Sequence, residues 1–123
     1  MKFCWTTIMA KNMEESLRFY QDIVGLALQR RFQPAPGQEI AFLGEGETQV
    51  ELITNQKKVS VEFGQDISLG FATESLDALT ETLGKHGIAV HSGPFQPSPE
   101  LRFLYALDPN GLKIQFVEFA QRH

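Results

Sequence analysis

The sequence has little of what several classes of protein require. It contains one cysteine, Cys4, so no disulfide can form within the chain. No stretch approaches the roughly 20 consecutive apolar residues of a membrane span, and the N-terminal residues lack the layout of a signal peptide. Lysine and arginine are scattered without a basic run, which argues against nucleic acid as a partner. We therefore expect a soluble cytoplasmic protein that contacts neither nucleic acid nor membrane.

The composition instead fits a folded domain with a sizeable core. The chain has 123 residues, of which 42% are hydrophobic and 21% charged, as expected for one globular domain. Ten of the 13 aromatic residues are phenylalanine. The net charge of −4 mildly favours a neutral or cationic ligand.

The C-terminal part of the chain carries the clearest local pattern, LDPNGLKIQFVEF. Proline followed by Asn-Gly predicts a tight turn at Asp108–Gly111. After it the residues alternate, so that Gln115 and Val117 point to one side and Ile114 and Phe116 to the other, which is typical of a strand. The earlier segment ETQVELIT alternates in the same way around Glu51. The two strands look like copies of each other.

Alternation, capping residues and turn residues divide the first half of the chain into one helix and four strands. Asn12 and Glu15 form a plausible capping pair for a helix that Gly25 ends. The predicted strands of this half are Lys2–Met9, Leu26–Gln33, Glu39–Leu43 and Thr48–Thr54, with a loop at Pro34–Gly37.

The same order of elements follows a polar connector, Asn55–Asp66, whose alternating middle, Val59–Phe63, can pair at a sheet edge. Ser75 caps a second helix that Gly87 ends. The predicted strands of this half are Ile67–Ala72, Ala89–His91, Leu101–Leu107 and Lys113–Phe119, with a loop at Ser92–Pro99.

The spacing of equivalent residues indicates an internal repeat. Trp5 precedes Ser68 by 63 positions, and Glu51 precedes Gln115 by 64. We therefore predict an α+β fold in which two βαβββ modules, residues 1–54 and 67–119, are joined by a linker at 55–66 within a single domain. The two sheets would form a cupped mixed sheet around a central cavity, with positions 5, 51, 68 and 115 close together.

Three segments carry a resemblance to a known superfamily over nearly the whole chain. SLRFYQDIVGL, VELIT and LDPNGLKIQFVEF resemble the vicinal oxygen chelate superfamily, which includes glyoxalase I, extradiol dioxygenases, fosfomycin-resistance enzymes and bleomycin-resistance proteins. The resemblance implies paired βαβββ units and a homodimer. It also implies that metal-dependent members carry ligands on the first and last strands of each unit.

Those ligand positions correspond to Trp5, Glu51, Ser68 and Gln115, and among them only Glu51 is a strong metal ligand. An indole has no lone pair for a metal, while a hydroxyl and a neutral amide are poor substitutes for histidine and carboxylate. We therefore expect no metal cofactor and assign no catalytic residue. His91 lies near a strand end and is a weaker candidate for a base facing a pocket.

The candidate ligand-binding residues are those that strand alternation or the resemblance places around the cavity. They are Trp5, Thr7, Phe42, Glu51, Ser68, Arg102, Phe103, Tyr105 and Gln115. Each also has a purely structural interpretation: Trp5 as a core aromatic, Glu51 as a carboxylate paired with another polar group, and Arg102 as a solvated charge at the sheet edge. Cys4 is expected to be a small buried hydrophobic residue.

These expectations lead to one principal function and two alternatives. The principal one is metal-independent binding of a small, partly apolar or cationic molecule in an aromatic-lined cavity, similar to bleomycin-resistance proteins. The first alternative is a metal enzyme, lactoylglutathione lyase-like or dioxygenase-like, that uses Glu51 with substitute ligands. The second is a structural or regulatory dimer whose cavity is filled by its own side chains.

Overall fold

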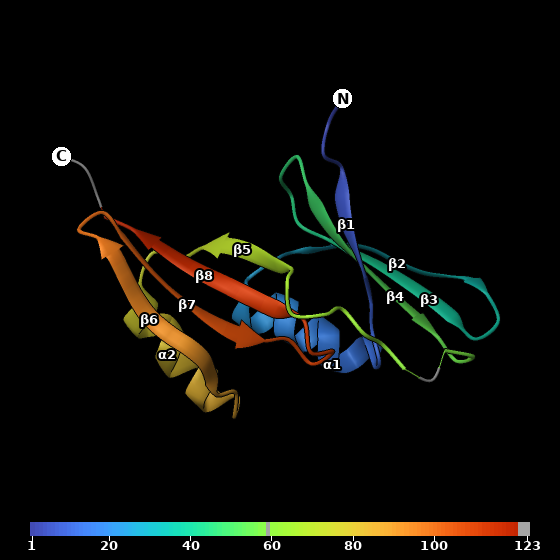
Figure 1. Ribbon diagram of the computed structural model, residues 1–123. Helices are drawn as coiled ribbons and strands as arrows, with labels where there is room; N and C mark the ends of the chain where they lie inside the picture. Colours follow the sequence, from blue (N-terminus) through green and yellow to red (C-terminus); the bar gives the residue numbers. More distant parts are fainter. Residues whose placement is uncertain (59, 121–123) are drawn as a thin grey trace. The chain divides into compact units, whose positions relative to one another are not determined.

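The computed structural model describes residues 1–58 and 60–120 and divides the chain into two units, Met1–Glu62 and Phe63–His123. The boundary between the units falls inside the predicted linker 55–66. Each unit contains one four-stranded mixed sheet (Figure 1). None of the helices among the described residues has the length and apolar character needed to span a bilayer.

Unit 1 begins with a strand and a short helical segment. Strand β1 (Trp5–Met9) leads to helix α1 (Met13–Arg18), which continues as a π-helical turn, η1 (Phe19–Ile23). The remaining strands are β2 (Leu28–Ala35), β3 (Gln38–Leu43) and β4 (Gln49–Asn55). The strand order is β1-β4-β3-β2, with β1 parallel to β4 and the other neighbours antiparallel.

Unit 2 repeats this topology. Its elements are β5 (Ser68–Ala72), α2 (Leu76–Lys85), β6 (Val90–Ser98), β7 (Leu101–Leu107) and β8 (Lys113–Phe119). The strand order is β5-β8-β7-β6, and again only the first pair, β5 with β8, is parallel. The predicted α+β fold of two βαβββ modules is confirmed, while the single-domain organisation and the central cavity stay predictions.

The predicted capping residues begin both helices. The Asn12 side chain accepts a hydrogen bond from the backbone N–H of Glu15 at 2.9 Å, and the Ser75 hydroxyl accepts one from Ala78 at 3.1 Å. These bonds satisfy backbone donors that the first helical turn leaves without partners. Gly87 takes a φ of +70° just after α2, a conformation that favours glycine at a helix end.

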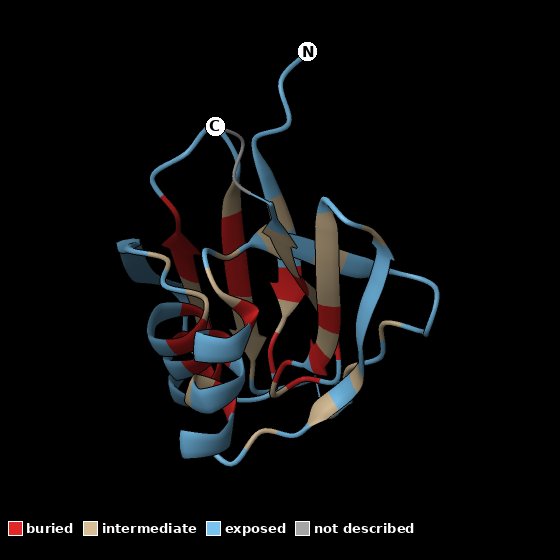
Figure 2. Cartoon of the chain, turned by 90° about the vertical axis from the view of Figure 1, so that its left-hand side faces the viewer, coloured by how far each residue is buried: buried red, intermediate tan, exposed pale blue. Residues whose placement is uncertain are grey.

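Each helix packs on one face of the sheet in its own unit, α1 against β4 and α2 against β7 and β8. In unit 1 the helix-facing strand residues Val50 and Leu52 are buried, and in unit 2 Ile114 and Phe116 are (Figure 2). The alternate residues of the same strands lie on the opposite face. Within each unit that second face, here called the open face, is not covered by the unit's own helix.

The structure extends two strands beyond their predicted ends. β2 runs through Pro34 to Ala35, and β6 runs from Val90 to Ser98 across the predicted loop at Ser92–Pro99. Both are edge strands of their sheets, where a proline can be tolerated because one side of the strand needs no hydrogen-bonded neighbour. Both also contain register irregularities. Proline was therefore a misleading loop signal at these positions.

Two smaller expectations also need correction. The first strand begins at Trp5, not at Lys2. The described part of the alternating connector, residues 60–63, forms no strand, and Val59 lies outside the described residues.

Candidate ligand-binding faces

A single row of side chains crosses the open face of unit 1. By strand register Thr7 lies beside Glu51, Glu51 beside Phe42, and Phe42 beside Arg30. The row therefore runs over all four strands and contains one acidic and one basic residue, separated by a phenyl ring. We call it the charged row.

The acidic end of the charged row is shielded and already hydrogen-bonded. Glu51 is 9% exposed, and its Oε1 accepts a hydrogen bond from the Thr7 hydroxyl at 2.5 Å. A buried carboxylate needs such partners because its transfer out of water is unfavourable unless new hydrogen bonds replace those that it made with water. The predicted structural interpretation of Glu51, a carboxylate paired with another polar group, matches this geometry.

Aromatic rings surround the middle of the charged row. The rings of Trp5 and Phe42 meet edge to face with centroids 5.3 Å apart, and Phe32 lies nearly parallel to Phe42 at 6.5 Å. The Arg30 guanidinium lies 4.6 Å from the Phe42 centroid and 5.4 Å from that of Phe32, within the range of cation–π attraction. Phe42 is buried, while Trp5 is 46% and Phe32 40% exposed.

The equivalent row in unit 2 has no charged member. Gly70 lies beside Gln115, Gln115 beside Tyr105, and Tyr105 beside Ser92. These four positions follow Thr7, Glu51, Phe42 and Arg30 by 62 to 64 residues, so the predicted repeat holds strand by strand. We call this the neutral row.

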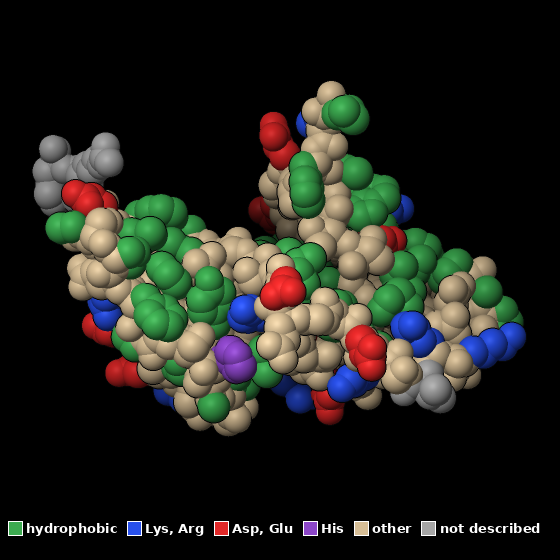
Figure 3. Space-filling view, viewed as in Figure 1, with side chains coloured by type: hydrophobic (Ala, Val, Ile, Leu, Met, Phe, Trp, Pro, Cys, Tyr) green, Lys and Arg blue, Asp and Glu red, His purple; other side chains and the backbone are tan. Residues whose placement is uncertain are grey.

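Aromatic side chains also gather on the open face of unit 2. Phe95 and Phe103 have centroids 5.5 Å apart, and Phe103 meets Tyr105 edge to face at 5.8 Å. The Lys113 ammonium lies 5.2 Å from the Tyr105 centroid. The hydrophobic patch over β6, β7 and β8 is visible in Figure 3. Both open faces thus combine aromatic rings with a cation.

A second, apolar row runs beside the charged row in unit 1 and beside the neutral row in unit 2. In unit 1 it consists of Met9, Ile53, Ile40 and Phe32. In unit 2 it consists of Ala72, Val117, Phe103 and Phe95. The units therefore share the apolar part of their open faces and differ in the polar part.

The structure places eight of the nine predicted ligand-binding residues on the open faces. Unit 1 presents Trp5, Thr7, Phe42 and Glu51, and unit 2 presents Ser68, Phe103, Tyr105 and Gln115.

Arg102 is the exception, because alternation places it on the helix-facing side of β7. Its guanidinium lies 3.8 Å from a carboxylate oxygen of Asp77 on α2 and 3.7 Å from one of Glu118 on β8. Glu118 in turn accepts a hydrogen bond from the backbone N–H of Leu76 at 2.8 Å. Arg102 therefore links the helix to the sheet and does not join the open face.

The sequence-based site omitted the two cations of the open faces, Arg30 and Lys113. Arg30 alternates in phase with Phe32 along β2, so strand parity could have identified it once β2 was known to be regular there. The neighbouring Arg31 points to the other side, where it forms ion pairs with Glu14 of α1 and Glu39 of β3. These carboxylates, Glu39 first and then Glu14, raise the pKa of Arg31 above its ordinary value.

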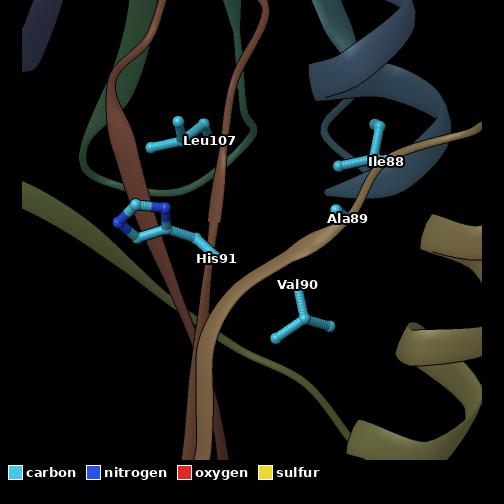
Figure 4. A pocket seen from close by; sticks show the side chains of 5 residues that line it. All are labelled: Ile88, Ala89, Val90, His91 and Leu107. Carbon is cyan, nitrogen blue, oxygen red and sulfur yellow. The ribbon is translucent and has the colours of Figure 1, made fainter.

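A surface pocket of about 370 Å³ in unit 2 lies outside the predicted site. It is lined by Ile88, Ala89, Val90, His91 and Leu107, with the His91 imidazole and the Leu107 side chain near each other (Figure 4). His91 is exposed and is the second residue of β6.

Two further pockets are polar. One, of about 410 Å³, shares His91 and Leu107 with the first and is also lined by Gly64, Gln65, Asp66, Gly111 and Lys113. The other, of about 330 Å³ in unit 1, is lined by Lys11, Asn12, Met13, Glu39, Thr54, Asn55, Gln56 and Lys58. None of the three contains a predicted ligand-binding residue.

The expectation for Cys4 is wrong, because the residue is exposed. It shares strand parity with Ile8, which is buried at 1% exposure, but it precedes the first paired residue of β1. Alternation predicts burial only where other residues cover the strand, and Cys4 precedes the paired part of β1.

The donor atoms at the four positions that the resemblance assigns to metal ligands do not fit a catalytic divalent metal. Trp5 packs its ring against Phe42, and one carboxylate oxygen of Glu51 accepts a hydrogen bond from Thr7. Ser68 and Gln115 supply a hydroxyl and a neutral amide. Among residues 1–58 and 60–120 no group of three or more His, Cys, Asp or Glu side chains is arranged to bind a metal.

Comparison with known families agrees with the fold and with the sequence resemblance. The family model of the Glyoxalase/Bleomycin resistance protein/Dioxygenase superfamily matches residues 2–116. The chain therefore belongs to this superfamily.

Curated relatives include two bacterial proteins named lactoylglutathione lyase. The one from Haemophilus influenzae is 26% identical over 126 residues, covering 96% of this chain and 93% of the relative. The one from Neisseria meningitidis serogroup A is 29% identical over 127 residues, covering 96% of this chain and 91% of the relative.

Solved structures with the same fold come from organisms of several kinds. Glyoxalase I of Leishmania major, described as trypanothione-dependent, superposes with a TM-score of 0.81 at 20% identity, covering 96% of this chain and 86% of that one. A glyoxalase family protein of Bacillus cereus gives 0.82 at 18% identity, covering 98% and 95%. Glyoxalase I of Zea mays gives 0.84 at 21%, and this chain covers 46% of its length.

Proposed function

We propose that the protein binds a small, partly apolar organic molecule without a metal, and that the ligand contacts the open face of unit 1. The observation that carries this proposal is the exposed aromatic surface formed by Trp5 and Phe32 on either side of the buried Phe42 ring. Exposed aromatic side chains present large rigid surfaces, and a planar guest removes apolar area from water at little cost in conformational entropy.

The polar groups of this face supply orientation. The Arg30 guanidinium and the Glu51 carboxylate flank Phe42 in the charged row. Ligand sites characteristically combine an apolar lining with a few well-placed polar groups, and this face has both. The open face of unit 2 offers a similar apolar row but no charge in its neutral row.

Binding is tested by adding 2-naphthamide, an uncharged planar probe, to the purified protein and recording Trp5 fluorescence and heat of binding. The sequence has one tryptophan, so a fluorescence change reports on this face. We expect saturable binding that weakens by about tenfold in Trp5→Ala, since stacking on an aromatic ring contributes roughly 1–3 kcal/mol. Absence of heat and of any fluorescence change up to the solubility limit of the probe would contradict the proposal.

Independence from metal is tested separately by elemental analysis of the purified protein alongside Glu51→Gln. We expect far less than one metal ion per chain in both proteins, and unchanged probe binding after treatment with a chelator. One nickel, zinc or manganese ion per chain that disappears in the variant would overturn this part of the proposal.

A lyase-like metal enzyme is the second candidate, and the curated relatives named lactoylglutathione lyase favour it. In this chain the reaction would depend on Glu51 with substitute ligands, which are weaker metal donors than histidine or a carboxylate. Loading the protein with nickel or zinc and assaying lactoylglutathione lyase activity tests this candidate. Turnover that is lost in Glu51→Gln would favour the metal enzyme over metal-independent binding.

A further inference from the structure

Arg30 is the accessible charge of the unit 1 open face. Its side chain lies over Phe42 and Phe32, and it forms no ion pair with any carboxylate among the described residues of unit 1, 1–58 and 60–62. The adjacent Arg31, on the other face of β2, pairs with two carboxylates. Two consecutive arginines therefore differ sharply in how far their charge is neutralised.

Arg30 is exposed and pairs with no carboxylate among the described residues of unit 1, so its N–H donors remain available to a ligand. Arginine stacks through the flat face of the guanidinium, whereas its N–H donors lie in the plane and project from the edge. Such a fork can donate two parallel hydrogen bonds to one carboxylate. Stacking on Phe42 also restricts the side chain, so less conformational entropy is lost when an anion binds.

The acidic member of the row is less available to a ligand. Glu51 is 9% exposed and accepts a hydrogen bond from Thr7, while Arg30 is exposed. A guest lying on Trp5 and Phe32 would therefore meet a positive charge at its rim, although the chain as a whole carries a net charge of −4. The local charge, not the net charge, acts at contact distance, because salt screens charges beyond roughly 8–10 Å.

From this arrangement we propose that the open face of unit 1 selects small aromatic molecules that carry a carboxylate, with Arg30 as the residue that determines the charge preference. The inference rests on the proposed ligand-binding function and names the chemical class of the ligand. It reverses the expectation of a cationic guest that the acidic composition suggests. Because β2 is an edge strand, the carboxylate can reach Arg30 from the side of the sheet.

The test compares three probes with the same ring system: 2-naphthoate, 2-naphthamide and 2-naphthylmethylammonium. Calorimetry at low salt should show that the full-length protein binds the carboxylate about five- to tenfold more tightly than the amide, and the ammonium most weakly, as expected for a charge-assisted bond at a partly solvated site. Raising the salt concentration should shrink the advantage of the carboxylate.

Arg30→Gln and Arg31→Gln form a matched pair of variants, because they remove the same charge from adjacent positions on opposite faces. Arg30→Gln should abolish the preference for 2-naphthoate over 2-naphthamide. Arg31→Gln should keep the preference. Arg30→Lys should retain part of it, since a lysine keeps the charge but loses the planar fork.

The possible outcomes bear differently on the role of Arg30 and on the proposed aromatic site. Equal binding of all three probes, or a preference for 2-naphthoate that survives in Arg30→Gln, would overturn the role of Arg30 and leave the aromatic site intact. Tightest binding of the ammonium probe would overturn the charge preference in favour of Glu51. Failure of all three probes to bind would contradict the proposed function and this inference together.

Discussion

The two units have the same topology and similar apolar rows, yet unit 1 has a charged row where unit 2 has a neutral row. Unit 1 presents Thr7, Glu51, Phe42 and Arg30, whereas unit 2 presents Gly70, Gln115, Tyr105 and Ser92 at the equivalent register positions. The scaffold that orients the two rows is therefore common, and the difference lies in side chains that point away from the helices.

This difference separates the side chains that stabilise both sheets from those that vary between the two units. The helix-facing side carries the buried apolar residues in both units, because each sheet must remove one face from water to be stable. The open side can change its polar residues without altering that core. The charged and neutral rows therefore differ in charge on a repeated framework.

The largest predicted effect concerns the shared core. Leu17 and Leu79 are buried leucines of the two helices, 4% and 7% exposed. We expect Leu17→Ala and Leu79→Ala each to lower the free energy of unfolding by about 2–4 kcal/mol, since each leaves a cavity and loses buried apolar area. Urea denaturation followed by circular dichroism measures this. A loss below about 1 kcal/mol in one variant would break the equivalence of the two cores.

The second prediction reverses the charge at the end of the charged row. Arg30→Glu should weaken 2-naphthoate binding by at least tenfold and improve binding of 2-naphthylmethylammonium, because a carboxylate replaces the guanidinium. Ser92→Glu, at the equivalent position of the neutral row, serves as the comparison and should change both affinities less. Similar effects of the two variants, measured by calorimetry, would show that the rows do not differ in function.

The third prediction concerns the Thr7–Glu51 hydrogen bond. Thr7→Val removes the donor at nearly constant volume and should lower the free energy of unfolding by about 1 kcal/mol, since Glu51 keeps only limited access to water.

Gly70→Thr makes the reverse change in unit 2. A Cβ at position 70 would lie 3.4 Å from Gln115 Oε1, an ordinary contact with a movable side chain. We expect this variant to be neutral or more stable by up to about 0.5 kcal/mol, because glycine weakens a strand. A clear destabilisation in urea titrations would mean that unit 2 requires the glycine.

The smallest effect is expected from the arginines that link each helix to its sheet. Arg31→Gln should lower stability by about 0.5 kcal/mol, and Arg102→Gln by less, because the Arg102 pairs are longer and partly exposed. The raised pKa of Arg31 means that its contribution is complete below its unfolded pKa and is lost only as the pH rises through its folded pKa, in strongly alkaline solution. High salt should reduce both effects, and a larger loss at Arg102 would reverse the order.

Much of the fold could be predicted because its signals are local. The Asn12 and Ser75 caps, the alternation around Glu51 and Gln115, and the repeat spacing all depend on residues close in sequence or on a constant offset. The loop predicted at Ser92–Pro99 was wrong because proline is acceptable in an edge strand, and the position of a strand within a sheet is not a local property.

The candidate site was predictable only as far as strand parity was certain. Trp5, Phe42 and Tyr105 were placed on the correct side, whereas Arg102 was assigned to the cavity although its register sends it to the helix. Arg30 was overlooked because its alternation with Phe32 identifies its face only when the register of β2 is known. One residue of offset in a strand exchanges the two faces, so small errors in register move a side chain across the sheet.

The sequence by itself determined the repeated order of elements, the capping residues and the residue types at the four positions that the resemblance assigns to metal ligands. Tertiary structure alone decided which arginine is neutralised by carboxylates and which lies over aromatic rings. The physical reason is that hydrogen-bond register across strands distant in sequence brings Thr7, Glu51, Phe42 and Arg30 into one row, and only that register sets which charges meet.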